Sequence, residues 1–481
     1  MPETNFNNYS LGSDILKAIE LLNYKNPTSV QQRVIPYVFE SRDIIVKSRT
    51  GSGKTAAFAI PVCEQVRWEG NKPQALVIAP TRELAIQVRE EIFSIGRFKR
   101  LKVSVLYGGS SSYIQEKELK QKTHVVVGTP GRIIDHIERG NFDTSEIKYL
   151  VIDEADEMLD MGFIEQIEEI INKLPKDRST LIFSATMPAD ITALCDKYMK
   201  EPIIVQIDEE NPVAEMIYQE KCFVGSDDKI KILMDIIIVE NPDSCIIFCN
   251  TKQKVEEVYG ELARSDYSCE KLHGGMEQSD RLKVMDSFRQ GCFRYLIATD
   301  VAARGIDIDN ISLVINFDIP QDKESYVHRI GRTGRMDRKG KAITFYSLGE
   351  EKYLNAIHEY IGYGLVSREK PDAETVDNSR LKFNEKTSKR PEFKGTKGSV
   401  LNSEIIKIHI NAGRKNKMRA ADIVGTLCSI EGITSEDIGI INIYDVSSFV
   451  EILNNKGEEV LKELRNKTIK GRQRKVKKVL Q

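Results

Sequence analysis

The chain has 481 residues, of which 41% are hydrophobic and 30% are charged, so it is large enough to bury the cores of several domains. It contains no apolar run of the length that a membrane helix needs, and its first residues lack the basic and apolar regions of a signal peptide. The net charge of -2 argues against a uniformly basic nucleic-acid binder. We therefore expect a cytoplasmic protein that does not contact a membrane.

The eight cysteines and six histidines are dispersed along the chain. No CxxC pair occurs, and no group of His and Cys has the spacing of a zinc site. Cys245 and Cys249 both fall in one apolar run, at positions that share a face if the run is a strand. We expect buried free thiols and no structural metal.

Strand-like and helical patterns alternate along most of the chain. A helical stretch covers residues 1–40, and from residue 43 short apolar runs alternate with helical patterns long enough to join parallel strands. The expected strands lie at 43–48, 75–80, 103–109, 124–130, 149–152, 180–186 and 203–207, and, after a break near 208–217, at 219–224, 244–251, 269–275, 295–300, 313–320 and 342–348. This predicts two α/β domains with parallel sheets, at 1–208 and 209–364.

The last part of the chain differs in composition. Residues 365–403 lose all periodicity and fill with Lys, Glu, Ser, Thr, Pro and Gly, which is typical of a flexible linker. Residues 404–481 regain strand and helix patterns in the order β–α–β–β, and they hold 15 Lys and Arg against 10 Asp and Glu. We therefore expect a small, basic α+β domain after the linker.

A glycine-rich turn, Ser48–Thr55, follows the first strand and opens a helix. In that context the backbone N–H groups of the turn and the helix N-terminus bind phosphate oxygens. Lys54 is placed to reach the β- and γ-phosphates, and Thr55 to help hold Mg²⁺. Ser48 replaces the first glycine of the usual pattern, which leaves a chance Gly/Ser turn as the alternative. The expected nucleotide ligands of this turn are Arg49, Thr50, Gly51, Ser52, Gly53, Lys54 and Thr55.

An apolar run that ends in acids, Tyr149–Asp156, forms the second half of this site. The strand delivers Asp153 and Glu154 to the carboxyl edge of the sheet, where parallel sheets bind their ligands. Taken alone, the stretch is explained equally well by an acidic strand-to-helix turn. With a phosphate site upstream, Asp153 becomes a second Mg²⁺ ligand and Glu154 the residue that positions the attacking water. The two stretches together predict a nucleoside triphosphatase.

The motifs within residues 6–364 are similar, in order, to those of DEAD-box RNA helicases. The resemblance implies two tandem RecA-like domains that bind ATP, Mg²⁺ and RNA. It also implies that Tyr24 and Gln31 belong to the motif that reads adenine and that Phe6 stacks on the base. Asn23 replaces the usual glycine of that motif.

The same resemblance assigns residues to RNA contact, coupling and catalysis. Asp156 is implied to link the nucleotide site to Ser184 and Thr186, which couple hydrolysis to unwinding. Arg332 and Arg335 of the second domain are implied to act as arginine fingers on the γ-phosphate, so that hydrolysis requires the two domains to close. The implied catalytic set is Lys54, Asp153, Glu154, Arg332 and Arg335, with Asp307 near the ribose. The implied RNA contacts are Pro80, Thr81, Arg82, Gly109, Thr129, Pro130, Gly131, Arg132, Gln278, Arg281, Thr299 and Arg304.

The pattern of the C-terminal domain fits an RRM-like fold, but it lacks the aromatic-rich signature of a base-stacking sheet. Its basic loop, with Arg414, Lys415, Lys417 and Arg419, is the expected RNA contact. The domain is similar to the RNA-binding domain of the bacterial DEAD-box protein A (DbpA) subfamily. That resemblance implies 23S rRNA in a pre-50S particle as the partner and a role in 50S assembly. We expect a monomer.

Three functions remain open at this point. The first is an RNA-dependent ATPase and helicase with specificity for rRNA. The second is an ATP-gated RNA clamp or remodelling scaffold that hardly unwinds, or a general helicase for mRNA or cold adaptation. The third is a P-loop enzyme of another kind, such as a kinase or a DNA translocase, which the set of motifs in two domains disfavours.

Overall fold

The computed structural model describes residues 5–48, 51–207, 216–225, 228–300, 311–334, 339–389, 401 and 403–479. The chain forms two compact units, Met1–Ile207 together with Lys397–Gln481, and Asp208–Thr396. We call residues 5–207 lobe 1, residues 216–389 lobe 2 and residues 403–479 the C-terminal domain. Among the described residues, no helix is both long and apolar enough to span a bilayer.

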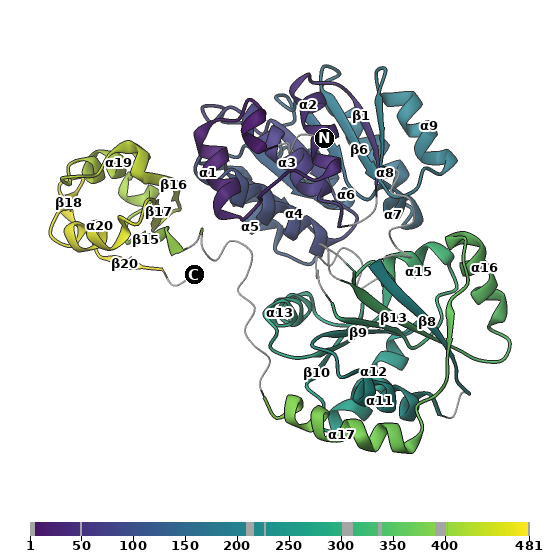
Figure 1. Cartoon of the computed structure of the whole chain (residues 1–481). Coiled ribbons are helices and arrows are strands. Elements are labelled where there is room, and N and C mark those ends of the chain that lie inside the picture. The colour runs from purple at the N-terminus through teal and green to yellow at the C-terminus, as the bar shows by residue number, and fades with distance from the viewer. Residues whose placement is uncertain are drawn as a thin grey trace. The chain divides into compact units, whose positions relative to one another are not determined.

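Lobe 1 is built on a seven-stranded parallel sheet with the order β3-β4-β2-β5-β6-β1-β7 (Figure 1). Its strands are β1 (Ile44–Lys47), β2 (Ala75–Ile78), β3 (Val103–Leu106), β4 (Val125–Gly128), β5 (Tyr149–Ile152), β6 (Ser179–Ser184) and β7 (Ile203–Gln206). Every strand expected in this lobe is present, because apolar β-branched runs bounded by turns suit a sheet that is covered on both faces.

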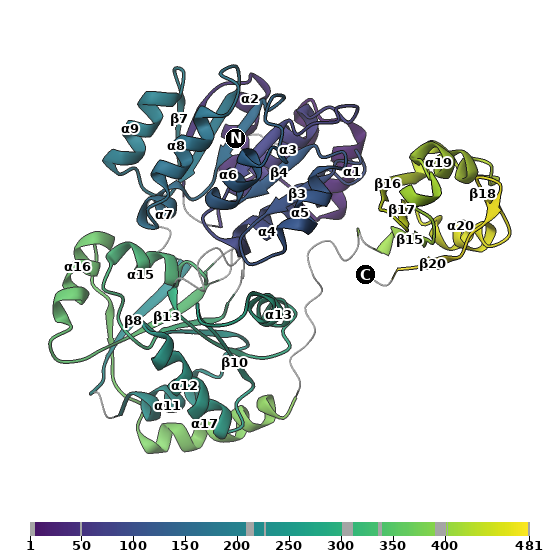
Figure 2. The ribbon, with the colours of Figure 1, turned by 180° about the vertical axis from the view of Figure 1, so that it is seen from behind.

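Helices cover both faces of this sheet (Figure 2). Alternate strand residues point to opposite faces, so Val151 packs in one core and its neighbour Ile152 in the other. The first core includes α1 (Ser13–Leu21), α2 (Ser29–Phe39), α3 (Lys54–Gln65) and α4 (Arg82–Ile95). The second includes α6 (Pro130–Glu138), α7 (Ala155–Asp160), α8 (Ile164–Asn172) and α9 (Ala189–Tyr198), while α5 (Ser112–Leu119) connects β3 to β4.

Lobe 2 repeats this architecture with a second seven-stranded parallel sheet, in the order β10-β11-β9-β12-β13-β8-β14. Its strands are β8 (Ile217–Phe223), β9 (Cys245–Phe248), β10 (Cys269–Leu272), β11 (Tyr295–Ala298), β12 (Leu313–Asn316), β13 (Gly340–Tyr346) and β14 (Val366–Arg368). One core includes α11 (Lys229–Glu240), α12 (Lys252–Arg264) and α17 (Ala373–Thr387), and the other α13 (Gln278–Arg289), α15 (Lys323–Ile330) and α16 (Glu351–Ile361). The expected pair of RecA-like domains is confirmed.

Part of the expected linker is folded. β14 and α17 lie within residues 365–403, and α17 packs against α11. Val376 and Phe383 of α17 are buried in the core of lobe 2, and their spacing of seven places them on one helix face. The other positions of α17 are mostly polar, which conceals its periodicity. The linker prediction is therefore wrong for residues 366–387, and residues 390–400 lie outside the described part of the chain.

The C-terminal domain has the order β–α–β–β–α–β around a four-stranded antiparallel sheet, β16-β17-β15-β20. The elements are β15 (Ile406–Ile410), α19 (Ala420–Cys428), β16 (Ile438–Ile443), β17 (Ser448–Ile452), α20 (Gly457–Leu464) and β20 (Val476–Lys478). Both helices pack on one face of the sheet, where Ile408 and Val450 are fully buried. α20 and β20 complete the RRM-like order beyond the expected β–α–β–β.

Candidate ATPase and RNA-binding sites

The strand order of lobe 1 divides the carboxyl edge of its sheet into two halves. β5, β6 and β1 are neighbours, and the residues expected to bind and hydrolyse the nucleotide follow them. β3, β4 and β2 are also neighbours, and the motifs expected to contact RNA follow those strands. Since parallel sheets bind ligands at this edge, one lobe gathers both groups of candidate residues side by side.

The glycine-rich turn runs from β1 into α3. Gly51 and Gly53 have φ angles of 81° and 86°, a left-handed backbone that glycine adopts without strain. Lys54 is the first residue of α3 and is buried, and its Nζ donates to the carbonyl of Ser48 at 3.3 Å. The ammonium is thus held against the turn with which it is expected to bind phosphate. Arg49 and Thr50 lie outside the described residues.

The segment before α2 is fastened to this turn. Thr28 Oγ1 donates to the Ser52 carbonyl at 2.9 Å, and Gln31 Nε2 donates to the Gly53 carbonyl at 3.2 Å. A Cβ on Gly53 would lie only 2.7 Å from Gln31 Nε2, so Gln31 would have to shift if Gly53 carried a side chain. Gln31 therefore contacts the glycine-rich turn, which sequence reasoning missed. The Thr-x-x-Gln spacing of Thr28 and Gln31 is a capping box, which signals only that a helix begins there. The contact of Gln31 with adenine stays a prediction.

Phe6 lies in the core of lobe 1 and is 2% exposed. Its ring centroid lies 6.5 Å from those of Tyr9 and Tyr24, and the Tyr24 hydroxyl donates to Glu91 at 2.7 Å. Stacking of Phe6 on a base requires one face of the ring to be uncovered. That contact stays a prediction, and so does the role of Asp307, which lies outside the described residues.

Asp153 follows β5 and is buried, and its Oδ1 accepts no hydrogen bond from the described residues. Burial raises the pKa of this carboxyl above its usual range, while the Lys54 ammonium acts in the opposite direction. A buried carboxylate oxygen that has no protein donor suits a divalent cation, and the Thr55 hydroxyl in the first turn of α3 is a second oxygen ligand of the kind that Mg²⁺ takes. Thr55 and Asp153 would hold the ion, which when bound neutralises charge on the phosphates.

Glu154 precedes α7 with φ 54° and ψ 54°. This left-handed conformation costs a residue other than glycine about 1–2 kcal/mol. Such strain is concentrated at functional sites, where the surrounding structure maintains it. Glu154 is also buried and follows Asp153 directly. The tight turn therefore holds two acids at one point of the sheet edge, beside Lys54.

Asp156 is bonded to the end of β6. Its Oδ2 accepts from the backbone N–H groups of Ala185 and Thr186, at 3.0 and 2.8 Å, and from Thr186 Oγ1 at 3.1 Å. Its own N–H donates to Ser184 Oγ at 3.2 Å. The Ser184 carbonyl accepts in turn from Ser48 N–H at the start of the glycine-rich turn, at 3.1 Å. These hydrogen bonds join the acidic stretch to the glycine-rich turn through β6. The role of the network in coupling stays a prediction.

The motifs of the RNA half contact one another. Arg82 of α4 lies against the turn after β3, where a Cβ on Gly109 would be 2.5 Å from Arg82 Nη1. Gly109 has a φ of 82°, a left-handed backbone that favours glycine, and a side chain there would also force the Arg82 guanidinium to shift. Arg132 of α6 donates to the Ser110 carbonyl in the same turn at 3.3 Å. The N-termini of α4 and α6, with Pro80, Thr81, Thr129, Pro130 and Gly131, begin at this edge and offer N–H groups that suit phosphates.

Arg329 organises the corresponding edge of lobe 2 and is 2% exposed. Its guanidinium donates to both carboxylate oxygens of Asp300, at 2.5 and 2.6 Å, to Asn250 Oδ1 at 2.8 Å and to the Asp318 carbonyl at 2.6 Å. It thereby ties together the turns that follow β9, β11 and β12. Sequence reasoning missed this residue, although it stands in the same arginine-rich segment as Arg332.

The other candidate residues of lobe 2 are only partly described. Gln278 and Arg281 lie on α13, Thr299 follows β11, and the buried Arg332 follows α15. Arg304 and Arg335 lie outside the described residues.

Three family models match the chain: DEAD/DEAH box helicase at residues 28–194, Helicase conserved C-terminal domain at 228–337 and DbpA RNA binding domain at 407–478. ATP-dependent RNA helicase DbpA of Bacillus subtilis (strain 168) is 53% identical over 475 residues, which cover 99% of each chain. The chain belongs to the DbpA family of DEAD-box ATP-dependent RNA helicases. It is thus an RNA-dependent ATPase, and the P-loop enzymes of other kinds are excluded.

More distant relatives agree with this assignment. DEAD-box ATP-dependent RNA helicase CshA of Geobacillus kaustophilus (strain HTA426) is 45% identical over 354 residues, which cover 74% of this helicase and 76% of CshA. The structure of S. cerevisiae Dbp5 bound to RNA and ADP BeF3 has a TM-score of 0.71 and 32% identity, and it covers 79% of this helicase and 99% of Dbp5.

The RNA-binding domain of this helicase carries a cluster of three rings, from His409, Phe449 and Tyr444, which follows β16. His409 of β15 lies 5.0 Å from Phe449 of β17 between ring centroids, and Tyr444 lies 5.8 Å from Phe449. Sequence reasoning missed His409, because strand pairing alone brings it beside Phe449. The basic loop is exposed at Arg414, Lys415, Lys417 and Arg419, as a phosphate-binding loop requires.

Replacing Lys54 with alanine is expected to weaken ATP binding about 10- to 100-fold, because a charge-assisted hydrogen bond to phosphate contributes about 1.5–3 kcal/mol. Titration with a fluorescent ATP analogue measures the change. Lys72→Ala is the matched control. Lys72 precedes β2, so it lies away from the carboxyl edge of the sheet, and its exposed side chain pairs with Asp143. Unchanged ATP affinity in Lys54→Ala would contradict the assignment of the phosphate turn.

Proposed function

We propose that this helicase unwinds short duplexes in 23S rRNA during assembly of the 50S subunit, in the cytoplasm, with Mg²⁺ as the ion that accompanies ATP. The main support for this proposal is the C-terminal domain. It matches the DbpA RNA binding domain, and one of its loops presents four exposed cations that can bind phosphates. All eight cysteines are free thiols, which fits a reducing compartment.

The proposed chemistry is divided between the lobes. Lys54, Asp153 and Glu154 belong to lobe 1, whereas Arg332 and Arg335 belong to lobe 2. ATP that contacts both sets favours a closed arrangement of the lobes, and hydrolysis requires it. Glu154 then orients the attacking water, and the two arginines stabilise the charge that develops on the γ-phosphate.

RNA takes part in the same equilibrium. Motifs of both lobes are assigned to the RNA backbone, so RNA and ATP each favour closure and strengthen one another's binding. A closed form that accepts only a bent single strand releases the partner strand locally. Hydrolysis and release of phosphate reopen the lobes, and we assign the coupling of these events to the network of Asp156, Ser184 and Thr186.

The proposal predicts that the basic loop sets the preference for rRNA. Replacing Arg414, Lys415, Lys417 and Arg419 with alanine in the full chain is expected to weaken 23S rRNA binding about 100-fold and to bring it close to that of poly-uridine, because four cations that bind phosphates are removed. ATPase stimulation by 23S rRNA, 16S rRNA and poly-uridine at one salt concentration measures this.

The matched control replaces four exposed lysines of lobe 1. Lys173 and Lys176 follow α8, Lys197 lies on α9 and Lys200 follows it. Equal weakening in both variants would assign the effect to net charge and reject the loop. Release of a short labelled strand is measured beside ATPase activity. Stimulated ATPase activity with no strand release would favour an ATP-gated clamp over a helicase that acts on rRNA duplexes.

A further inference from the structure

An ion pair joins the C-terminal domain to lobe 1. Arg97, just after α4, lies 3.0 Å from Glu451 of β17, measured from Nε to Oε2, and both side chains are 6% exposed. The Arg97 guanidinium also lies 4.6 Å from the centre of the Phe93 ring. A buried ion pair adds little stability by itself, but breaking it leaves an unpaired buried charge, so it selects one arrangement of the two surfaces.

Three polar contacts, each between a cation and a neutral oxygen, surround this pair. Arg100 Nη2 donates to the Ser435 carbonyl at 2.7 Å, and Lys102 Nζ donates to the Ile441 carbonyl at 2.6 Å. Lys17 Nζ donates to Asn454 Oδ1 at 2.8 Å. In each contact lobe 1 supplies the cation and the C-terminal domain supplies the oxygen. Complementarity of this kind sets the orientation of two surfaces more than their affinity.

An apolar cluster supplies the attraction. Phe98 and Ala18 of lobe 1 pack with Leu401, Ile405 and Leu453, and each of the five is at most 6% exposed. Burial of a side chain such as Phe98 stabilises a contact by about 1.5–3 kcal/mol. Lobe 1 thus has a docking face that this domain covers.

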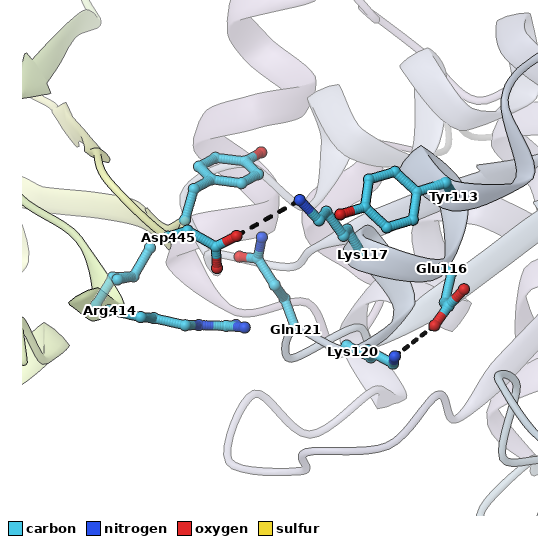
Figure 3. A pocket seen from close by; sticks show the side chains of 9 residues that line it. Tyr113, Glu116, Lys117, Lys120, Gln121, Arg414 and Asp445 are labelled. Carbon is cyan, nitrogen blue, oxygen red and sulfur yellow. Dashed lines mark hydrogen bonds and ion pairs between the residues drawn. The ribbon is translucent and has the colours of Figure 1, made fainter.

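The docked domain closes a hollow of about 270 Å³ against α5 (Figure 3). Lobe 1 contributes Tyr113, Lys117 and Lys120, and the C-terminal domain contributes Arg414 and Tyr444. The remaining lining residues are Glu116, Gln121, Ile443 and Asp445. Cations interleaved with tyrosines are the composition that binds a sugar-phosphate backbone and stacks a base.

The charges of the hollow are not balanced. Lys120 pairs with Glu116, and Lys117 Nζ lies 3.5 Å from Asp445 Oδ2. Arg414 forms no ion pair with a carboxylate in the described part of the chain, and its guanidinium reaches into the hollow (Figure 3). The hollow therefore has an excess of one positive charge, which favours an anionic ligand, and Arg414 belongs to the basic loop proposed to bind rRNA.

The hollow also continues the RNA half of lobe 1. α5 begins two residues after Ser110, whose carbonyl accepts from Arg132. The turn after β3 therefore leads directly into the helix that carries Lys117 and ends just before Lys120. A strand that leaves the RNA motifs of lobe 1 along α5 therefore arrives at the basic loop.

We propose that the C-terminal domain docks on lobe 1 through Arg97 and Glu451, and that docking forms a composite site in which Lys117, Lys120 and Arg414 bind the RNA sugar-phosphate backbone. This inference rests on the proposed function, and it adds that the recognised rRNA segment is held at a fixed offset from the motifs that unwind its neighbour. A freely tethered domain would impose no such offset.

The first experiment tests docking by charge exchange. Donor and acceptor dyes are placed on Lys173→Cys and Glu431→Cys in a full chain whose exposed Cys292 and Cys428 are replaced by serine. Arg97→Glu and Glu451→Arg are each expected to lower energy transfer, and the double exchange is expected to restore it. Glu451→Gln, which keeps the shape of the side chain, is expected to lower energy transfer less. Two exposed charges serve as controls: Lys197→Glu on α9 and Glu458→Arg on α20.

The second experiment tests the composite site with a 23S rRNA transcript. Replacing Lys117 and Lys120 with alanine is expected to weaken binding about 10-fold and to reduce the slope of log affinity against log salt by about 0.7 for each phosphate that is no longer neutralised. In the Arg97→Glu background the same replacement is expected to have no further effect, because the site is already open.

The outcomes separate this inference from the proposed function. A wild-type chain without preference for 23S rRNA over poly-uridine would reject the proposed function. A chain that has this preference rejects the inference if energy transfer is the same in the single and double variants. It also rejects the inference if the effects of Arg97→Glu and the lysine replacement simply add.

Discussion

Glu154→Gln is expected to reduce RNA-stimulated ATP turnover about 10²- to 10⁴-fold, while the affinities for ATP and RNA stay close to those of the wild type. The amide has the size of the carboxylate but cannot take up a proton from the attacking water. Lys54 and Asp153, which are proposed to bind the phosphates and the ion, are untouched by the change. Single-turnover hydrolysis with saturating RNA measures the chemical step.

A matched control for this variant is Glu165→Gln, which removes one carboxylate from an exposed position on α8. Its turnover is expected to equal that of the wild type. Wild-type turnover in Glu154→Gln would remove Glu154 from its proposed role. Thermal unfolding is measured for both variants. Glutamine keeps the Cβ, so it does not relieve the left-handed strain at residue 154, and the unfolding temperature is expected to stay close to that of the wild type.

Arg332→Ala is expected to reduce turnover about 10³- to 10⁵-fold, the effect of losing an arginine finger. This corresponds to about 4–7 kcal/mol of barrier. ATP is expected to bind almost normally, because the phosphate turn belongs to lobe 1 and keeps Lys54. Stopped-flow release of phosphate measures turnover, and nucleotide titration measures affinity.

Arg329→Ala provides the contrast to Arg332→Ala. Arg329 holds Asp300 through two hydrogen bonds in a buried setting, so its loss is expected to destabilise lobe 2 by about 3–5 kcal/mol. Calorimetry should therefore show a lowered unfolding temperature for Arg329→Ala, whereas Arg332→Ala should lose activity in a folded chain. Near-normal turnover in a folded Arg332→Ala variant would exclude the arginine finger.

Local patterns were enough to predict the two sheets and most of the candidate ATPase site. The run Tyr149–Ile152 is apolar at every position and is buried throughout, as a strand covered on both faces must be. The turn Ser48–Thr55 lies between a strand and a helix that are its immediate neighbours in the chain. Spacing and turn chemistry act over a few residues, so these features can be inferred without knowledge of distant contacts.

Contacts between distant segments decided the rest. α17 was hidden because only Val376 and Phe383 reach the core of lobe 2, and Arg329 acquires its role from turns that follow three different strands. The pairing of Arg97 with Glu451 joins residues at opposite ends of the chain. The sequence around Arg97 does not indicate that its partner is Glu451, and the sequence around Glu451 does not indicate Arg97. Charge complementarity between two surfaces produces no periodic pattern along the chain. The motifs of the helicase are therefore local, whereas the place where its RNA-binding domain docks depends on the folded surfaces.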